Sequence, residues 1–102
     1  MEKIYKVRLL PSARNDLKDS RLWYRAINAD LPKRFAFYVN ESINNISLFP
    51  HAYAIRYKNI RIANVRIFPF AIHFFIDEDI DTVIVIAIHH SSINPEKWAE
   101  RI

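Results

Sequence analysis

The feature that most constrains the fold is a run of six apolar residues, 83–88, near the end of the chain. The run is rich in valine and isoleucine, residue types that favour strands. A strand with two apolar faces is usually central in a sheet and covered by other structure. We therefore expect a buried strand at residues 82–88, with a second layer of structure packed over it.

Apolar patterning predicts four further strands. Near the N-terminus, Tyr5, Val7 and Leu9 are separated by cationic residues, and Pro11 ends this alternation. Three later segments are rich in isoleucine, valine, phenylalanine and tyrosine, as strands usually are: residues 54–57, 60–68 and 70–76.

Two helices are expected between the first strand and the rest of the sheet. Ser12 is placed to cap the first helix, and apolar residues then recur at helical spacing as far as Ile27. Residues 28–32 form a short break. From Phe35 onward, apolar residues again repeat every three or four positions until Pro50 stops the pattern. The two helices should form a hairpin.

The order of these elements predicts an α+β fold. An N-terminal strand and a helical hairpin precede a meander of strands, and the short connections at residues 58–59 and 77–81 favour antiparallel pairing. Asn94 and Pro95 predict a short C-terminal helix that carries Trp98. We expect residues 1–102 to form a single domain, with the sheet packed on the hairpin.

Composition excludes several classes of protein. Because cysteine is absent, disulfide frameworks, thiolate metal sites and cysteine nucleophiles are excluded. Because glycine is absent, glycine-rich phosphate loops are excluded too. Residues 1–6 do not resemble a secretory signal, and the longest apolar stretch, 67–76, is about half of the roughly 20 residues that a membrane-spanning helix needs. We expect a cytoplasmic protein that does not enter a membrane.

Charge is distributed unevenly along the chain. Fifteen lysine and arginine residues against eleven acidic residues give a net charge of +4. Four cations, Arg56, Lys58, Arg61 and Arg66, lie between residues 49 and 76, where no acidic residue occurs. On a twisted sheet they could bind nucleic acid or another anionic target. The alternative is a solvated face without a binding role.

Three histidines near the ends of the expected strands are candidates for proton transfer, because imidazole titrates near neutral pH. They are His73, His89 and His90. Alternation along a strand places His89 and His90 on opposite faces, so one of them at most shares a surface with the arginines. A structural or partner-binding role is the competing interpretation. We find no residue series with metal-ligand spacing and expect neither a metal nor a cofactor.

Several short motifs, in this order, resemble the RelE/ParE superfamily of toxins, including ParE-like plasmid stabilisation proteins. The resemblance rests on segments 56–61, 66–74, 87–90 and 94–98, the last reading Asn94-Pro95-Glu96-Lys97-Trp98. It covers nearly the whole chain. It implies the toxin component of a type II toxin–antitoxin system, whose partner is a cognate antitoxin that folds on the toxin surface.

The superfamily implies two mechanisms of growth inhibition. A RelE-like toxin is a ribosome-dependent endonuclease that cleaves messenger RNA, and here Arg61, Arg66 and His90 would be its catalytic residues. A ParE-like toxin is not an enzyme but binds DNA gyrase and traps its cleaved complex. In either case Arg56, Lys58, Arg61 and Arg66 would contact the target, and Arg66 is the strongest single candidate.

One position departs from the ParE-like pattern. Where members commonly have an arginine three residues after the last-strand histidine, this chain has Ile93 after His90. The departure leaves open a third interpretation, a degenerate member without toxic activity that serves as an antitoxin-binding or co-repressor module.

Overall fold

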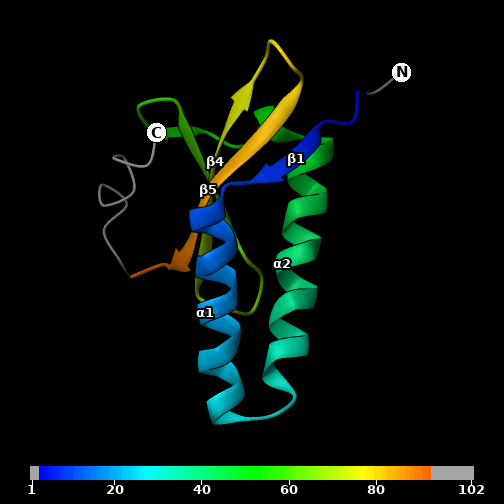
Figure 1. The fold of residues 1–102 in the computed structure, drawn as a ribbon. Helices are drawn as coiled ribbons and strands as arrows, with labels where there is room; N and C mark the ends of the chain where they lie inside the picture. The colour runs from blue at the N-terminus through cyan, green and yellow to red at the C-terminus, as the bar shows by residue number, and fades with distance from the viewer. Residues whose placement is uncertain (1–2, 93–102) are drawn as a thin grey trace.

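The computed structural model describes residues 3–92, which form one five-stranded sheet with a helical hairpin on one face (Figure 1). In chain order the elements are β1 (Lys6–Leu9), α1 (Pro11–Ile27), α2 (Leu31–Leu48), the 3-10 helix η1 (Pro50–Ala52), β2 (Ile55–Tyr57), β3 (Ile60–Asn64), β4 (Phe70–Asp77) and β5 (Thr82–His90). The predicted order of strand, helical hairpin and antiparallel meander is confirmed. The predicted C-terminal helix lies outside the described residues.

The sheet has the strand order β1-β5-β4-β3-β2. Strands β2 to β5 form the predicted antiparallel meander. Strand β1 pairs with β5 in parallel, from Lys6 beside Thr82 to Leu9 beside Val85. The sequence assigned no neighbour to β1. Because β1 and β4 flank β5, the most apolar strand lies inside the sheet, as its two apolar faces predicted.

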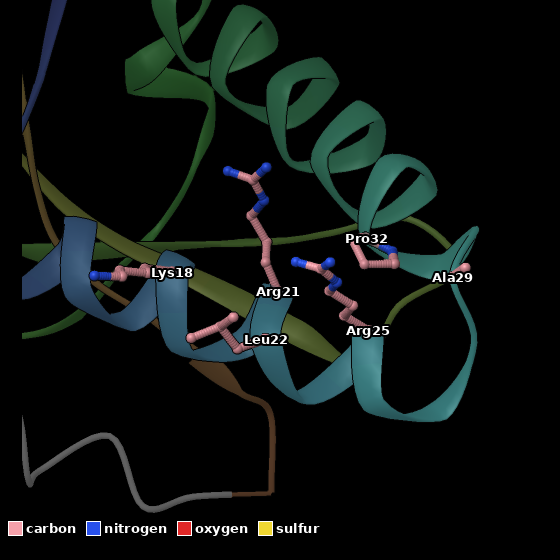
Figure 2. A pocket seen from close by; sticks show the side chains of 6 residues that line it. All are labelled: Lys18, Arg21, Leu22, Arg25, Ala29 and Pro32. Atoms are coloured by element: carbon pink, nitrogen blue, oxygen red, sulfur yellow. The ribbon is translucent and has the colours of Figure 1, made fainter.

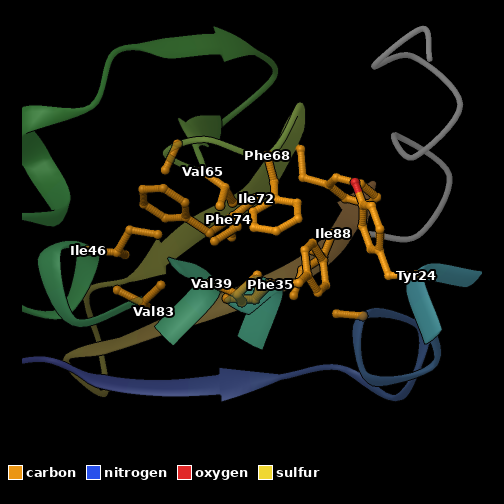
Figure 3. Packing of buried hydrophobic residues seen from close by; sticks show 14 residues of the cluster. Tyr24, Phe35, Val39, Ile46, Val65, Phe68, Ile72, Phe74, Val83 and Ile88 are labelled. Atoms are coloured by element: carbon orange, nitrogen blue, oxygen red, sulfur yellow. The ribbon is translucent and has the colours of Figure 1, made fainter. Parts of the chain in front are cut away.

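The main core lies between the hairpin and the sheet (Figure 3). Phe35 of α2 is fully buried, and its ring lies 5.2 Å from Tyr24, 5.4 Å from Phe68 and 4.9 Å from Phe70, measured between ring centroids. Burial raises the pKa of the Tyr24 phenol. These aromatic contacts fasten both helices to β4 and to the loop before it.

A bulge in β5 supplies a second link between hairpin and sheet. His73 pairs with Ala87 and Phe74 with Val85, so Ile86 is an extra residue on β5. Next to the bulge, the Ile88 amide donates a hydrogen bond to the Asp16 carboxylate of α1 at 3.1 Å. The Asp16 side chain of the hairpin thus provides a hydrogen-bond acceptor for the Ile88 backbone amide, which lies beside the bulge.

Two predicted boundaries are wrong. Helix α1 begins at Pro11, with Leu10 as its N-cap, rather than after Ser12. Proline is favoured in the first helical position, and the Ser12 hydroxyl instead donates to the Ile86 carbonyl at 3.1 Å. Helix α2 begins at Leu31, so the break between the helices is shorter than predicted and Pro32 lies inside the first turn.

The strand predicted at residues 60–68 is also wrong in its second half, because β3 ends at Asn64. The Val65 amide donates to the Phe70 carbonyl at 2.9 Å and closes a loop over residues 65–69. In this loop Ile67 has φ of 72°, a left-handed conformation that is strained for a β-branched residue. Arg66 therefore lies in a loop and not in a strand.

No helix within residues 3–92 has the combination of length and apolar character that crossing a membrane requires.

Candidate functional site

The sheet has two faces that matter for function. One face packs against the hairpin, and we call the other the far face. Arg61 and Arg66 lie on the hairpin side, whereas Arg56 lines a pocket on the far face. Lys58 lies in the tight turn between β2 and β3 with φ of 47°. The four predicted target-binding cations are therefore not gathered on one surface.

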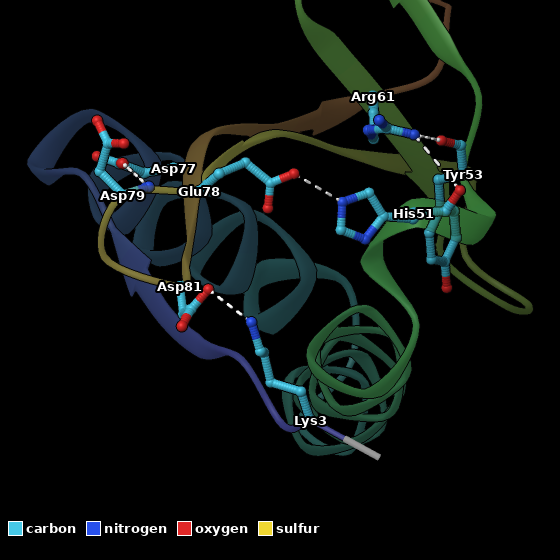
Figure 4. Close-up of polar contacts among 8 residues, drawn as sticks. All are labelled: Lys3, His51, Tyr53, Arg61, Asp77, Glu78, Asp79 and Asp81. Atoms are coloured by element: carbon cyan, nitrogen blue, oxygen red, sulfur yellow. Dashed lines mark hydrogen bonds and ion pairs between the residues drawn. The ribbon is translucent and has the colours of Figure 1, made fainter. Parts of the chain in front are cut away.

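Arg61 is held by backbone carbonyls (Figure 4). Its guanidinium donates to the Tyr53 carbonyl at 2.6 Å and to the His51 carbonyl at 3.4 Å. Burial raises the pKa of the Tyr53 phenol. The Arg61 side chain thus fastens the segment after α2 to β3, which is a structural task.

The same end of the sheet carries exposed ion pairs. His51 lies 3.0 Å from Glu78, and Lys3 lies 2.9 Å from Asp81 (Figure 4). The hydrogen bond to Asp81 raises the pKa of Lys3. Glu78 and Asp81 in the turn after β4 therefore already have side-chain partners within this chain, and Lys3 with Asp81 is a pair of opposite charges.

Arg66 is placed differently from Arg61. Its guanidinium lies 3.1 Å from the Glu41 carboxylate of α2 and 5.7 Å from the centre of the Tyr38 ring. The Arg66 side chain is nevertheless 67% exposed. Helix α2 therefore orients the arginine without burying it, and the loop presents it to solvent.

The far-face pocket has a volume of about 180 Å³ and is mostly polar in its side chains. Arg56, Asn64, His73, His89 and Ser91 line it together with two apolar residues. Among residues 3–92, its lining contains one cation and no carboxylate. Such a lining suits an anionic or hydrogen-bonding ligand.

Beneath this pocket three side chains form a histidine network: Tyr57, His73 and His89. The Tyr57 hydroxyl lies 2.8 Å from Nδ1 of His73, and Nε2 of His73 lies 2.6 Å from Nε2 of His89. Nδ1 of His89 lies 2.8 Å from the His90 carbonyl. Both imidazoles are buried.

When both rings are neutral, the His90 carbonyl sets the direction of the three hydrogen bonds just described. A carbonyl only accepts, so Nδ1 of His89 carries a hydrogen and, in a neutral ring, Nε2 of His89 accepts. His73 then donates from Nε2 and accepts from the Tyr57 hydroxyl at Nδ1. All four ring nitrogens are used within the protein, which leaves neither ring a free nitrogen for a substrate.

His90, the predicted catalytic histidine, lies on the other side of the sheet. Its ring packs 5.7 Å from Phe70, and it lines an apolar notch with Trp23 of α1. The opposite faces predicted for His89 and His90 are confirmed. His90, Arg61 and Arg66 share the hairpin side, but they contact α1, η1 and α2 respectively.

Sequence reasoning did not identify the histidine network. His73 and His89 were considered separately, and Tyr57 was not considered. The network depends on pairing, because Ala71 lies opposite His89 and His73 is its diagonal neighbour on β4. Within residues 3–92 no three histidine, cysteine or acidic side chains are grouped to hold a metal ion.

Comparison with known families decides the identity. The family model described as "ParE toxin of type II toxin-antitoxin system, parDE" matches residues 7–95. The chain belongs to the ParE toxin family. Among curated protein sequences none matches the chain.

Two solved structures share the fold of this ParE family member. A chain of the chromosomal ParDE toxin–antitoxin system from P. aeruginosa has a TM-score of 0.73 and 13% identity, covering 85% of this chain and 96% of that one. A chain of the toxin–antitoxin complex RelBE2 from Mycobacterium tuberculosis has a TM-score of 0.63 and 22% identity, covering 86% and 92%. Both likenesses show that the fold is shared.

Replacing Tyr57 with phenylalanine should destabilise this toxin. The change removes the hydroxyl that lies 2.8 Å from Nδ1 of the buried His73 imidazole, so one hydrogen bond of the network is lost. We expect the free energy of unfolding in urea to fall by about 1–3 kcal/mol. Tyr38→Phe is the control, since the Tyr38 hydroxyl makes no hydrogen bond within residues 3–92. Equal stability of the two variants would contradict the network.

Proposed function

We propose that this ParE family member is a cytoplasmic toxin that arrests growth by binding DNA gyrase and trapping its cleaved complex, without catalysing a reaction itself. The loop between β3 and β4 carries the proposal. Ile67 is 65% exposed at φ of 72°, and it follows Arg66, which is also exposed. An exposed apolar residue held in a strained conformation beside an oriented arginine is typical of a protein-binding surface.

The buried histidine network supports binding over catalysis. A general acid or base must offer a nitrogen to the substrate. In the far-face pocket the ring nitrogens of His73 and His89 are occupied by Tyr57, by each other and by the His90 carbonyl. Arg56 is the single arginine there among residues 3–92, since Arg61 and Arg66 lie on the hairpin side.

We also propose a cognate antitoxin as the physiological partner. The two structural neighbours are described as a ParDE system and as a RelBE2 toxin–antitoxin complex. A folding antitoxin segment would cover apolar surface and neutralise cations of this chain.

A second candidate function is cleavage of messenger RNA on the ribosome. One observation favours it: the far-face pocket places Arg56 beside His73 and His89, a cation next to two imidazoles. For this activity the histidine network would have to open when RNA binds, so that one imidazole accepts the proton of a ribose 2′-hydroxyl.

Induction of the chain alone in bacterial cells tests these proposals. Growth curves, mapped transcript ends and a supercoiling assay with purified gyrase should show arrested growth, intact messages and blocked supercoiling. Messages cut within codons would replace the gyrase proposal with the nuclease. Unimpaired growth with abundant folded protein would instead favour the degenerate binding module, which the substitution at Ile93, outside the described residues, leaves open.

Replacing Arg66 with alanine should abolish growth arrest and leave the melting temperature nearly unchanged. The ion pair with Glu41 is exposed, and exposed ion pairs contribute about 0–1 kcal/mol to the free energy of unfolding. Glu41→Ala is the matched control, because it breaks the same pair but keeps the cation, and it should remain toxic. A folded and fully toxic Arg66→Ala protein would remove Arg66 from the target-binding surface.

A further inference from the structure

One face of α1 carries four cations in a row, which we call the basic row: Arg14, Lys18, Arg21 and Arg25. Their spacings of four, three and four residues place them within an arc of about 60° around the helix. Along the helix axis the row extends for about 16 Å. It forms a row of positive charge along one side of α1, and three of its members line a pocket with Pro32 of α2.

Within the part of the chain that the structure describes, no acidic side chain neutralises the basic row. All four side chains are exposed. None of them takes part in an ion pair or a side-chain hydrogen bond within residues 3–92. Figure 2 shows Arg21 and Arg25 reaching from α1 toward the start of α2, where they line a pocket of about 530 Å³ with Lys18 and Leu22.

Helix stability explains only Arg25, which lies in the last turn of α1 where the helix dipole favours a cation. Like charges three or four residues apart repel one another, and each member of the row has such a neighbour. The acidic residues of α1 lie elsewhere, Asp16 accepting a bond from the Ile88 amide and Asp19 lining the notch near His90. Neither helix has an acidic residue in its first turn. Uncompensated repulsion of this kind calls for an anionic partner.

We propose that the basic row binds the phosphate backbone of double-stranded DNA. One DNA strand presents a phosphate about every 3.4 Å along the axis, so a row of about 16 Å faces about five phosphates. Two or more arginines can clamp phosphates in bidentate fashion. The row extends one helical turn beyond the pocket to Arg14, so it exceeds what a small ligand would occupy.

The surroundings of the basic row favour DNA over an acidic amphipathic peptide. Such a peptide needs an apolar groove along its length. Beside the row the pocket offers one exposed large apolar side chain, Leu22, whereas Trp23 and Ile27 lie roughly opposite the row on the helix. The interaction goes beyond the proposed function and does not depend on whether gyrase or the ribosome is the target.

Fluorescence anisotropy with a labelled duplex of about 20 base pairs tests the proposal on the full chain. Four phosphate contacts predict that log Kd rises with log salt concentration with a slope of about 3.6, so Kd should rise about 150-fold from about 50 to 200 mM salt. Duplexes rich in A·T or in G·C should bind equally, because backbone contacts carry no sequence information.

Two variants with the same net charge distinguish DNA binding by the basic row from DNA binding by other cations of the chain. Changing Arg14, Lys18, Arg21 and Arg25 to glutamine should weaken binding at low salt by at least about 30-fold and nearly abolish the salt dependence. The control changes four exposed cations of β1 and the β2 region to glutamine, Lys6, Arg8, Arg56 and Lys58, and should bind within about threefold of the original chain. The double variant Lys18→Gln/Arg21→Gln should lose about half of the slope.

Three outcomes would overturn the proposal. Equal losses in both four-residue variants would show that net charge alone drives binding, and a larger loss in the control would move the DNA to the far face. A third result is that the basic-row variant keeps its affinity for DNA but no longer binds a peptide rich in glutamate and leucine. The partner is then an acidic protein. Circular dichroism of each variant confirms that it remains folded.

Discussion

The architecture depends on one constraint: β5 has no polar face, so it must be covered on both sides and paired along both edges. Strand β1 supplies one edge in parallel and β4 the other in antiparallel orientation. The hairpin covers one face through the aromatic contacts of Phe35 and Tyr24. The pairing of β1 with β5 ends at Val85, and beyond it the Asp16 carboxylate accepts a hydrogen bond from the Ile88 amide. Helix α1 is therefore fastened to the strand on which the sheet is built.

The same constraint explains the histidine network. His89 lies near the end of β5 and His73 on the adjacent strand, so both are buried with the apolar residues around them. Buried polar groups must be hydrogen-bonded, and Tyr57 with the His90 carbonyl completes the series. The far face thus uses its imidazoles to hold β2, β4 and β5 together. The exposed groups that remain for recognition are the Arg66 loop on the hairpin side and the basic row on α1. Both suit a toxin that acts by binding.

Periodicity was sufficient to predict the strands, the hairpin and the central position of β5, because burial imposes a repeat of two or 3.6 residues on the sequence. The alternation of side chains along a strand also placed His89 and His90 on opposite faces of the sheet. It did not reveal the parallel neighbour of β1, since the partner is more than 70 residues away in sequence. Residues 65–68 continue the apolar pattern and so are predicted as strand, whereas Ile67 turns the backbone there. The site is predicted less well from the sequence, because it depends on which strands are neighbours. Arg61 donates hydrogen bonds to backbone carbonyls near η1, and His73 hydrogen-bonds His89 only in the observed register.

Proton–nitrogen NMR correlation spectra of the imidazoles test the structural role of the histidine network most directly, because they report which ring nitrogen carries the hydrogen. With both rings neutral, the network predicts the hydrogen on Nε2 of His73 and on Nδ1 of His89. The opposite tautomer in either neutral ring would contradict it. Such a result would break the predicted order of donors and acceptors and favour catalysis over binding in the far-face pocket.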